Sequence, residues 1–495
     1  MMPEIAGTYI ATSVVGALAI TLSIAVYYAV RAVYLLFFHP LAKYPGPKLA
    51  AITELWGIWG FSTERLPFIL CDLHKKHGDI IRIGPNELSF ATLEAFQDIH
   101  GHVSKGKGRF LKTEFYENDD PTPRITGVRD PETHARQRKS LSHAFSAKSL
   151  RGQEEIVQSY VDGFTRQLAR LGNNGQTALD MSETFNWLTF DVIGDLSFGE
   201  PFGGIENGVT HTWIKILLDS VLNAQTQSFR RKLPFSNLIM PFFLPKGADE
   251  SLKMHRIFCR EKSQKRLQLA DTGRPDFFSH MLKRATMSVE EMMSQTSTFV
   301  VAGSETTATS LSGTTYFLLK NPDSMTKLQS EVRNAFASVE EITGDSTASL
   351  PYLHGVIEES LRLFPPVAFS MPRHSPGAVV DGHYIPEGTV VSVATMTMPR
   401  DPRYWYDADS FRPERWVGKG FNDEKKASQP FSMGARACLG INLAYLEMKL
   451  VLAKMVWLYD WELAVPRDEF VRDCKMRVLW KKPDLWVKYI PRPGA

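Results

Sequence analysis

The chain has 495 residues, of which 43% are hydrophobic and 22% are charged, as is usual for globular proteins. This composition excludes a disordered chain, a collagen-like repeat and a small disulfide scaffold. Lysine and arginine number 57 and aspartate and glutamate 54, and the resulting net charge of +3 is too balanced to favour nucleic acid as the main partner.

An apolar segment opens the chain. Residues 5–30 carry no charge, and Glu4 and Arg31 are the only charged residues among residues 1–38. As a helix, residues 5–30 would reach about 39 Å, enough to cross a hydrocarbon core of about 30 Å with some tilt. A cleaved signal peptide would have a basic start and a shorter apolar stretch, so we expect residues 1–38 to be an uncleaved membrane anchor. Basic residues follow the span but do not precede it, which predicts a cytosolic body.

Two further features agree with a cytosolic body. The four cysteines are widely separated and include no Cys-x-x-C, so a disulfide framework is not expected. The sequence also contains no Asn-x-Ser/Thr acceptor, as expected for a body that never meets the glycosylation machinery.

The part that follows the anchor is predicted to be one large, mainly helical domain rather than the roughly three domains that its length suggests. Residues 39–48 contain Pro-Gly-Pro and form a stiff hinge, and residues 49–495 contain no other strong linker. Alternating residues on both sides of Gly-Pro-Asn predict a β-hairpin over residues 79–90, and residues 384–393 predict another short β region. Most of the remainder has helical periodicity.

One long helix is marked at both ends. Ser288 and Glu291 form a capping box, and Asn321-Pro322 ends the helix, which predicts a length of about 31 residues or about 46 Å. Its centre, residues 302–307, reads Ala-Gly-Ser-Glu-Thr-Thr. Glycine and a carboxylate are unfavourable in the middle of a buried helix, so either this face is exposed or a function requires these residues.

The segment over residues 431–440 gathers glycine and arginine around one cysteine. Gly434 and Gly440 allow a positive φ and a close approach of the backbone, and Arg436 adds positive charge. Cys438 lies just before a predicted helix, whose N-terminus should lower the pKa of the thiol and favour the thiolate. The other three cysteines lack this context and are interpreted as small buried hydrophobic residues.

The pattern Phe-x-x-Gly-x-Arg-x-Cys-x-Gly over residues 431–440 resembles the haem-binding loop of cytochromes P450. Three further motifs of that family are present: residues 302–307 resemble the oxygen-activating part of its central helix, residues 359–362 its Glu-x-x-Arg motif, and residues 411–416 the motif that follows. Residues 134–139 are most similar to microsomal P450s of fungal secondary metabolism. The resemblance implies the mainly α cytochrome P450 fold with small β-sheets, preceded by a single transmembrane helix.

The resemblance also implies roles for individual residues. Cys438 would be the axial thiolate ligand of haem iron, which favours cleavage of the O–O bond. Thr306 and Glu305 match the family's acid–alcohol pair, in which the hydroxyl holds a proton at the bound oxygen and the carboxylate connects it to solvent. Ala302 and Gly303 would leave space above the haem, where the helix can bulge.

A structural triad and a set of haem contacts are implied as well. The family's buried triad, which shapes the side of the haem loop, maps to Glu359, Arg362 and Arg415. The expected haem contacts are His134, Arg138, Ala302, Gly303, Arg373, Phe431, Gly434, Arg436 and Gly440.

His134 departs from the family pattern, which has tryptophan at this position. Histidine can still donate to a haem propionate, although its charge would depend on pH. The alternative is a structural histidine with ordinary hydrogen bonds.

The resemblance implies haem b as the cofactor and NADPH as an indirect electron source. No nicotinamide or flavin fingerprint occurs in the sequence, so the electrons would come from an NADPH–cytochrome P450 reductase. The reductase would dock on a basic face formed by Arg136, Lys139, Lys148 and Arg151. The alternative is that these residues form an ordinary solvated surface. The family's microsomal members imply a single-pass protein of the endoplasmic reticulum membrane with a cytosolic catalytic domain.

The expected activity is a monooxygenase that hydroxylates or epoxidises a lipophilic small molecule in a fungal secondary-metabolite pathway. By analogy, the substrate pocket would draw on residues 101–128, 202–246, 296–301 and 367–371. The aromatic and aliphatic residues of these ranges indicate an apolar ligand or belong to the core. Two other functions stay open from the sequence: a P450-fold isomerase or dehydratase that needs no external electrons, and a non-catalytic carrier of haem or lipid.

Overall fold

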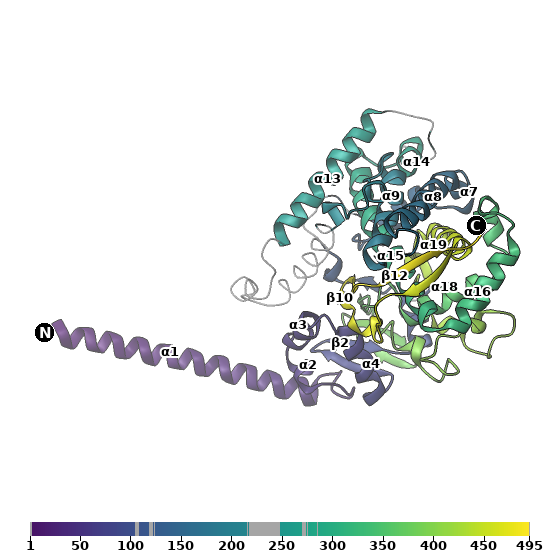
Figure 1. Ribbon diagram of the computed structural model, residues 1–495. Helices are drawn as coiled ribbons and strands as arrows, with labels where there is room; N and C mark the ends of the chain where they lie inside the picture. The colour runs from purple at the N-terminus through teal and green to yellow at the C-terminus, as the bar shows by residue number, and fades with distance from the viewer. Residues whose placement is uncertain are drawn as a thin grey trace.

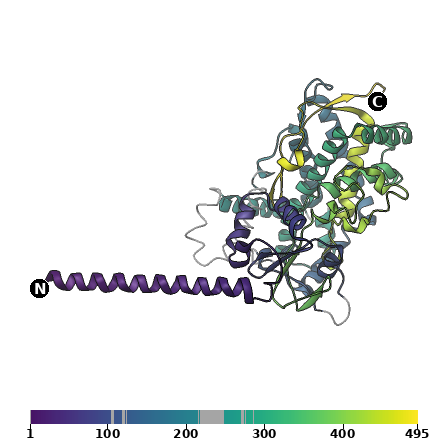
Figure 2. The ribbon, with the colours of Figure 1, turned by 90° about the horizontal axis from the view of Figure 1, so that it is seen from below.

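The N-terminal helix extends away from a body of packed helices and small sheets (Figure 1). The structure is a computed structural model that describes residues 2–103, 108–117, 122, 124–214, 216, 248–269, 274, 276–284 and 286–494. Helix α1 spans Met2–Val33 and continues directly as a π-helix over Tyr34–Phe38. Figure 2 shows the same long helix clear of the body from a second direction.

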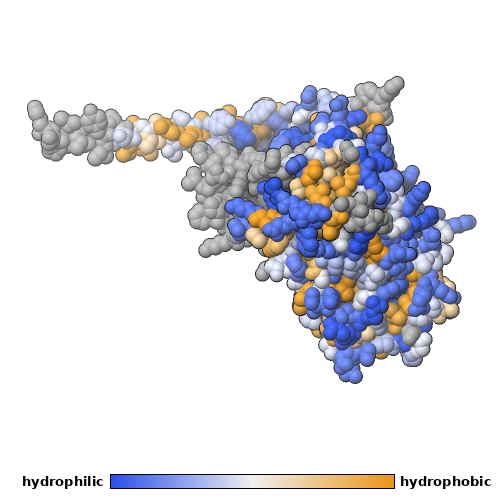
Figure 3. Space-filling model, turned by 90° about the horizontal axis from the view of Figure 1, so that it is seen from above, coloured by the Kyte–Doolittle hydropathy of each residue, from blue (hydrophilic) through white to orange (hydrophobic). Residues whose placement is uncertain are grey.

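The composition of α1 agrees with its position outside the body. The segment Ser13–Phe38 has 26 residues and a mean hydropathy of 2.0, and the side chains from residue 13 to residue 30 are exposed. By length and composition it can cross a membrane, as predicted. Figure 3 shows apolar side chains along this helix, whereas most of the visible surface of the body is hydrophilic.

Arg82 joins the end of the anchor to the body. Its guanidinium is buried and donates through Nη1 to the carbonyl of Leu35 at 2.7 Å and through Nη2 to the carbonyl of Pro85 at 2.5 Å. One side chain therefore satisfies carbonyls of both the π-helix and the first hairpin, which fixes where the helix leaves the body.

The predicted hairpin is confirmed and begins the largest sheet. Its strands β1 and β2 pair antiparallel, and the sheet has the order β1-β2-β8-β5-β3. The second predicted β region divides between two sheets, because β7 pairs with β6 while β8 lies parallel to β2. The strands of the body are β1 (Ile80–Gly84), β2 (Glu87–Phe90), β3 (Leu111–Lys112), β4 (Leu179–Asp180), β5 (Arg373–His374), β6 (Ala378–Val380), β7 (His383–Ile385), β8 (Val390–Val393), β9 (Tyr459–Leu463), β10 (Lys475–Arg477), β11 (Leu479–Lys481) and β12 (Trp486–Pro491).

Helices make up most of the body. The α-helices are α2 (Lys48–Ile52), α3 (Leu55–Ser62), α4 (Leu66–His77), α5 (Leu93–His100), α6 (Pro131–Ser142), α7 (Ala147–Arg151), α8 (Glu154–Leu171), α9 (Met181–Phe198), α10 (Gly204–Asn207), α13 (Ala248–Gln268), α14 (Phe277–Arg284), α15 (Val289–Lys320), α16 (Pro322–Ala335), α17 (Gly344–Thr347), α18 (Pro351–Leu363), α19 (Ile441–Leu458) and α20 (Phe470–Asp473). The short helical turns are η2 (Glu114–Tyr116), η4 (Val339–Glu341), η5 (Met398–Arg400), η6 (Pro413–Trp416), η7 (Lys425–Ala427) and η8 (Gly434–Arg436).

Helix α15 crosses the centre of the body, as Figure 1 shows. The predicted capping box is present, since Ser288 accepts from the Glu291 amide at 3.1 Å and the Glu291 carboxylate accepts from the Ser288 amide at 3.0 Å. The helix runs for 32 residues and ends before Asn321, which confirms the prediction. It packs against α9, α13, α18 and α19, and the largest hydrophobic core surrounds its C-terminal half.

Candidate active site

The cysteine segment forms a tight loop in front of α19. The amide of Cys438 donates to the carbonyl of Phe431 at 2.8 Å, which closes the loop. Gly434 has a φ of +72°, and a Cβ there would lie 2.2 Å from the carbonyl oxygen of His100, so no other residue fits. Gly440 has a φ of −88° with open space beside it, so this position uses neither the positive φ nor the close approach that glycine allows.

Cys438 differs from the other three cysteines in its exposure. It is exposed, whereas Cys71 is partly buried and Cys259 and Cys474 are buried. Although its side chain is accessible, desolvation by the surrounding protein raises the pKa of the Cys438 thiol above its ordinary value. The predicted lowering of this pKa is therefore wrong as a net effect, because the amide of Gly440 and the charge of Arg138 lower the pKa less than desolvation raises it.

The middle of α15 presents Ala302 and Thr306 on one accessible face. They are four residues apart, and the hydroxyl of Thr306 donates to the carbonyl of Ala302 at 2.6 Å. The helix is regular here, so the expected bulge is not present. A Cβ on Gly303 would lie 2.7 Å from Ile193 of α9, which corrects the expectation for this residue: its missing side chain lets the two helices pack closely.

Glu305 lies in a buried ion pair rather than in contact with solvent. Its carboxylate pairs with Lys482, which follows β11, and both side chains are buried. Thr309 donates to Glu305 Oε1 at 3.2 Å and accepts from Lys482 Nζ at 3.1 Å. The predicted link from Glu305 to solvent is wrong for this arrangement. Sequence reasoning missed Lys482, because it lies 177 residues away and no motif marks it.

The triad residues meet in the interior between α18 and η6. Glu359 accepts from Arg362 Nη2 at 2.7 Å and from Arg415 Nε at 2.9 Å, and the side chains of all three residues are fully buried. The indole of Trp416 also donates to Glu359 at 3.0 Å, and Arg415 pairs with Asp423 at 3.0 Å. The buried charges therefore satisfy one another, and Asp423 is a member of the network that sequence reasoning missed.

Three predicted haem contacts are arginines that donate to uncharged partners. Arg138 donates to the carbonyl of Ala437 at 2.7 Å, and Arg436 donates to the carbonyl of Val128 at the same distance. Arg373 donates to the hydroxyl of Tyr116, also at 2.7 Å. Within the part of the chain that the structure describes, none of the three arginines forms an ion pair with a carboxylate.

His134 is buried on α6, one turn before Arg138. Burial, and then the charges of Arg436, Lys112 and Arg138, together lower its pKa to about 3. The expected dependence of its charge on physiological pH is therefore wrong, because the ring stays neutral. A neutral imidazole still has one N–H to donate.

These residues fit a haem with a thiolate ligand and two anionic propionates. The loop presents an accessible thiol, and α15 presents a small residue and a hydroxyl on an accessible face. Among the described residues, Arg138, Arg373 and Arg436 form no ion pair with a carboxylate, and burial together with the charges of Arg373 and Arg138 lowers the pKa of Arg436 to about 10. Such a concentration of positive charge favours an anionic ligand.

The predicted substrate pocket is described only in part. Phe235, Phe242, Phe243 and most of residues 202–246 lie outside the described residues. Phe202 and Val300 are buried in a cluster with Trp213, so they belong to the core. Phe369 is partly buried and lies beside Phe115, with ring centroids 5.5 Å apart.

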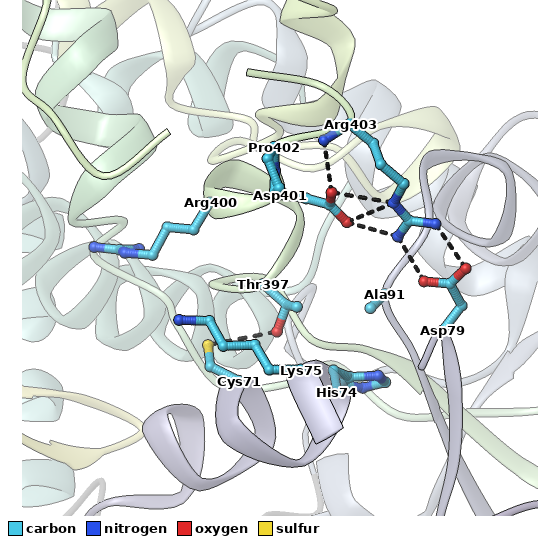
Figure 4. A pocket seen from close by; sticks show the side chains of 10 residues that line it. All are labelled: Cys71, His74, Lys75, Asp79, Ala91, Thr397, Arg400, Asp401, Pro402 and Arg403. Atoms are coloured by element: carbon cyan, nitrogen blue, oxygen red, sulfur yellow. Dashed lines mark hydrogen bonds and ion pairs between the residues drawn. The ribbon is translucent and has the colours of Figure 1, made fainter. Parts of the chain in front are cut away.

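A small pocket of about 180 Å³ lies elsewhere, between α4 and residues 397–403 (Figure 4). Arg403 borders it and pairs with Asp79 and with Asp401, each at 2.6 Å. None of the predicted site residues lines this pocket, so it is separate from the candidate active site.

Comparisons with known proteins identify the family. The cytochrome P450 family model matches residues 45–488. The cytochrome P450 monooxygenase BOA3 of Botryotinia fuckeliana is 40% identical, and the alignment covers 92% of this chain and 93% of that protein. The cytochrome P450 monooxygenase btcC of Colletotrichum orbiculare is 39% identical, with coverage of 95% and 93%. The cytochrome P450 monooxygenase astJ of Aspergillus oryzae is 40% identical, and the alignment covers 93% of this chain and 94% of that protein.

The resemblance to fungal monooxygenases of secondary metabolism is thereby confirmed. The family match also accounts for the mainly helical fold with small sheets. By this match and by the identity and coverage of its relatives, the chain belongs to the cytochrome P450 family and is a monooxygenase.

Proposed function

We propose that this enzyme hydroxylates or epoxidises a lipophilic small molecule of a fungal secondary-metabolite pathway, with O₂ and with electrons from NADPH through a reductase. The observation that carries the proposal is the accessible Cys438 in a loop surrounded by arginines that have no carboxylate partner in the described part of the chain. When bound, haem with a thiolate ligand supplies the chemistry of O₂ activation. The protein supplies the ligand, the contacts to the propionates and the protons.

Each group of site residues has a separate task in this proposal. Cys438 binds the iron, and Arg138, Arg373, Arg436 and His134 bind and orient the propionates. Phe431, Gly434 and Gly440 shape the loop that carries the ligand. The triad of Glu359, Arg362 and Arg415 holds the neighbouring segments in place.

Thr306 is the residue proposed to hold the proton that O₂ activation on a bound haem would require. Its hydroxyl donates to the carbonyl of Ala302, and rotation about one side-chain bond redirects the O–H toward a ligand on the same accessible face. Glu305 can resupply that proton only after its pair with Lys482 opens, because its carboxylate is buried in this arrangement. Proton delivery is therefore expected to depend on movement at Lys482.

Replacing Thr306 by alanine is expected to separate NADPH consumption from product formation. The variant should still consume NADPH but release mostly peroxide, with product formation lower by about 100-fold or more, the scale of a lost proton donor. The measurement is the ratio of product and peroxide to NADPH consumed. Thr306→Ser keeps a hydroxyl and is the matched control. An unchanged ratio in Thr306→Ala would exclude the proposed role.

Membrane attachment completes the proposal. Residues 1–38 form the anchor, residues 39–48 the hinge and residues 49–495 the catalytic domain, which faces the cytosol from the endoplasmic reticulum membrane. The exposed apolar surface of Ser13–Phe38 supports an anchor. A lipophilic substrate that partitions into the bilayer would then be concentrated near the enzyme.

The reductase is proposed to dock on the basic residues of α6 and α7. Arg136, Lys139, Lys148 and Arg151 are all exposed. Arg136 pairs with the partly buried Glu291, whereas Arg151 lies 3.4 Å from Asp345 in a pair that is exposed on both sides and can exchange for a partner's carboxylate. Electrostatic docking of this kind weakens as salt concentration rises.

Comparing the metabolites of a host with and without the gene is the experiment that tests the function. The compound that accumulates without the gene is then supplied to membranes that contain the full chain and a reductase. We expect an oxygenated product that requires both NADPH and O₂. Conversion without NADPH would indicate an isomerase or dehydratase instead, and binding without conversion would indicate a carrier.

A further inference from the structure

A buried lysine lies beside the propionate-binding arginines and belongs to no motif. Lys112 of β3 is directly opposite Arg373 of β5 in the antiparallel pair of these two strands. Its side chain is only 7% exposed. Like charges that face each other across a strand pair are destabilising, and burial increases that cost. The pairing of β3 with β5 therefore does not explain why a buried lysine lies at this position.

Tyr116 lies between these two cations. The ammonium of Lys112 is 4.4 Å from the centre of the Tyr116 ring, and the guanidinium of Arg373 is 5.3 Å from it. Arg373 Nη1 donates to the phenol oxygen at 2.7 Å. Because the phenol oxygen accepts this bond, its own O–H is directed to another acceptor. Tyr116 thus links the two cations and adds a donor beside them.

Lys112 has a carbonyl partner but no carboxylate partner among the described residues. Its ammonium donates to the carbonyl of Thr126 at 2.5 Å, which uses one of its three N–H groups. The acidic residues nearby in the sequence point elsewhere: Glu114 pairs with Arg129 at 2.7 Å and with His374 at 2.9 Å, and Glu117 also pairs with Arg129. The pKa of Lys112 is well below its usual range because of burial first, and then because of Arg436 and Arg373.

We propose that Lys112 and Tyr116 join Arg373 in binding a haem propionate. The remaining ammonium N–H groups and the phenol O–H would donate to the carboxylate, whose charge offsets the repulsion between Lys112 and Arg373. The proposal rests on the haem site described above and adds two residues to it.

The test uses purified full-length holoenzyme with haem bound. Two quantities are measured: the rate at which haem transfers to excess apomyoglobin, and the reduction potential of the iron. For Lys112→Met we expect transfer to be about 10- to 100-fold faster, the scale of a lost hydrogen bond to a charged group. The potential should also fall, because removal of a nearby positive charge disfavours the extra electron. Lys112→Arg should restore both quantities most of the way.

Lys454→Met is the matched control. Lys454 is also buried, with 3% exposure, but it lies on α19 and pairs with Asp162. Its replacement removes a buried ammonium of the same kind without touching β3 or β5. Transfer rate and potential in this variant should stay close to those of the unmodified enzyme.

A second variant decides the question if Lys112→Met fails to fold. Tyr116→Phe removes one hydroxyl, and we expect haem transfer to be about 3- to 10-fold faster. The proposal is overturned if both Lys112→Met and Tyr116→Phe release haem at the rate of the unmodified enzyme. Where Lys112→Met does not fold, the same result for Tyr116→Phe alone overturns it. Unmodified enzyme that binds no haem would instead contradict the proposed function, so the two failures are distinguishable.

Discussion

Replacing Cys438 by alanine is expected to abolish the spectrum of a thiolate-ligated haem completely. Of the four cysteines in the chain, all of which are described, Cys438 alone is exposed, and it lies in the loop that Gly434 closes against His100. Alanine has no atom that can bind iron, and no other described cysteine can reach this position. The measurement is the absorbance of the reduced, CO-bound enzyme, in which a thiolate ligand moves the main band to its characteristic long wavelength.

Cys71→Ala is the control for this substitution. Cys71 is partly buried on α4, where its sulfur accepts from the hydroxyl of Thr397 at 3.4 Å in the pocket of Figure 4. Burial raises the pKa of its thiol, and unlike Cys438 its side chain is not exposed to a ligand. The Cys71 variant should keep the thiolate band. A thiolate band that survives in Cys438→Ala would refute the assignment of the ligand.

Local signals predicted the elements of this fold well. The ends of α15 depend on Ser288, Glu291 and Asn321, and each acts through neighbours within one helical turn. The hairpin of β1 and β2 depends on alternation around a short turn, which is local as well. Such features are encoded within a few residues and can be read before the fold is known.

The partners of buried charges could not be predicted in the same way. Lys482 is 177 residues from Glu305, and only the packing of the segment after β11 against α15 brings them together. The helical period already places Thr306 above Ala302 and turns Glu305 to another face, so that part of the arrangement was available from the sequence. The residue that faces Glu305, Lys482, could not be predicted from the sequence.

The net pKa shift of a side chain under opposing influences could not be predicted from the sequence either. The amide of Gly440 at the start of α19 lowers the pKa of Cys438, in the direction expected of a helix N-terminus, and the charge of Arg138 does so as well, but desolvation raises it by more. The same applies to His134, whose neutral state follows from burial and from three surrounding cations rather than from the identity of the residue. The sign of a pKa shift depends on which term is larger, and the sizes are set by the packing.

Replacing Glu359 by glutamine is expected to have the largest effect on stability. The substitution keeps the shape of the side chain but removes the charge that Arg362 and Arg415 share, and both arginines have fully buried side chains. Breaking a buried ion pair in this way costs about 3–5 kcal/mol, a large part of the roughly 5–15 kcal/mol that stabilises a typical protein. We expect a low yield of haem-loaded enzyme and a much shorter half-life on heating, and these are the two measurements.

Glu358→Gln on the same helix is the control. It also replaces a glutamate by glutamine, but it does not remove the charge that two buried arginines share. The side chain of Glu358 is 12% exposed, and its carboxylate accepts from the hydroxyl of Tyr445. Glutamine can accept the same bond and leaves no arginine unpaired, so this variant should lose at most about 1 kcal/mol. Equal half-lives for the two variants would mean that the triad does not hold the haem side of the fold together. Because Arg415 also pairs with Asp423, Arg415→Lys should resemble Glu359→Gln more than Glu358→Gln, since lysine cannot reproduce both pairs of a planar guanidinium.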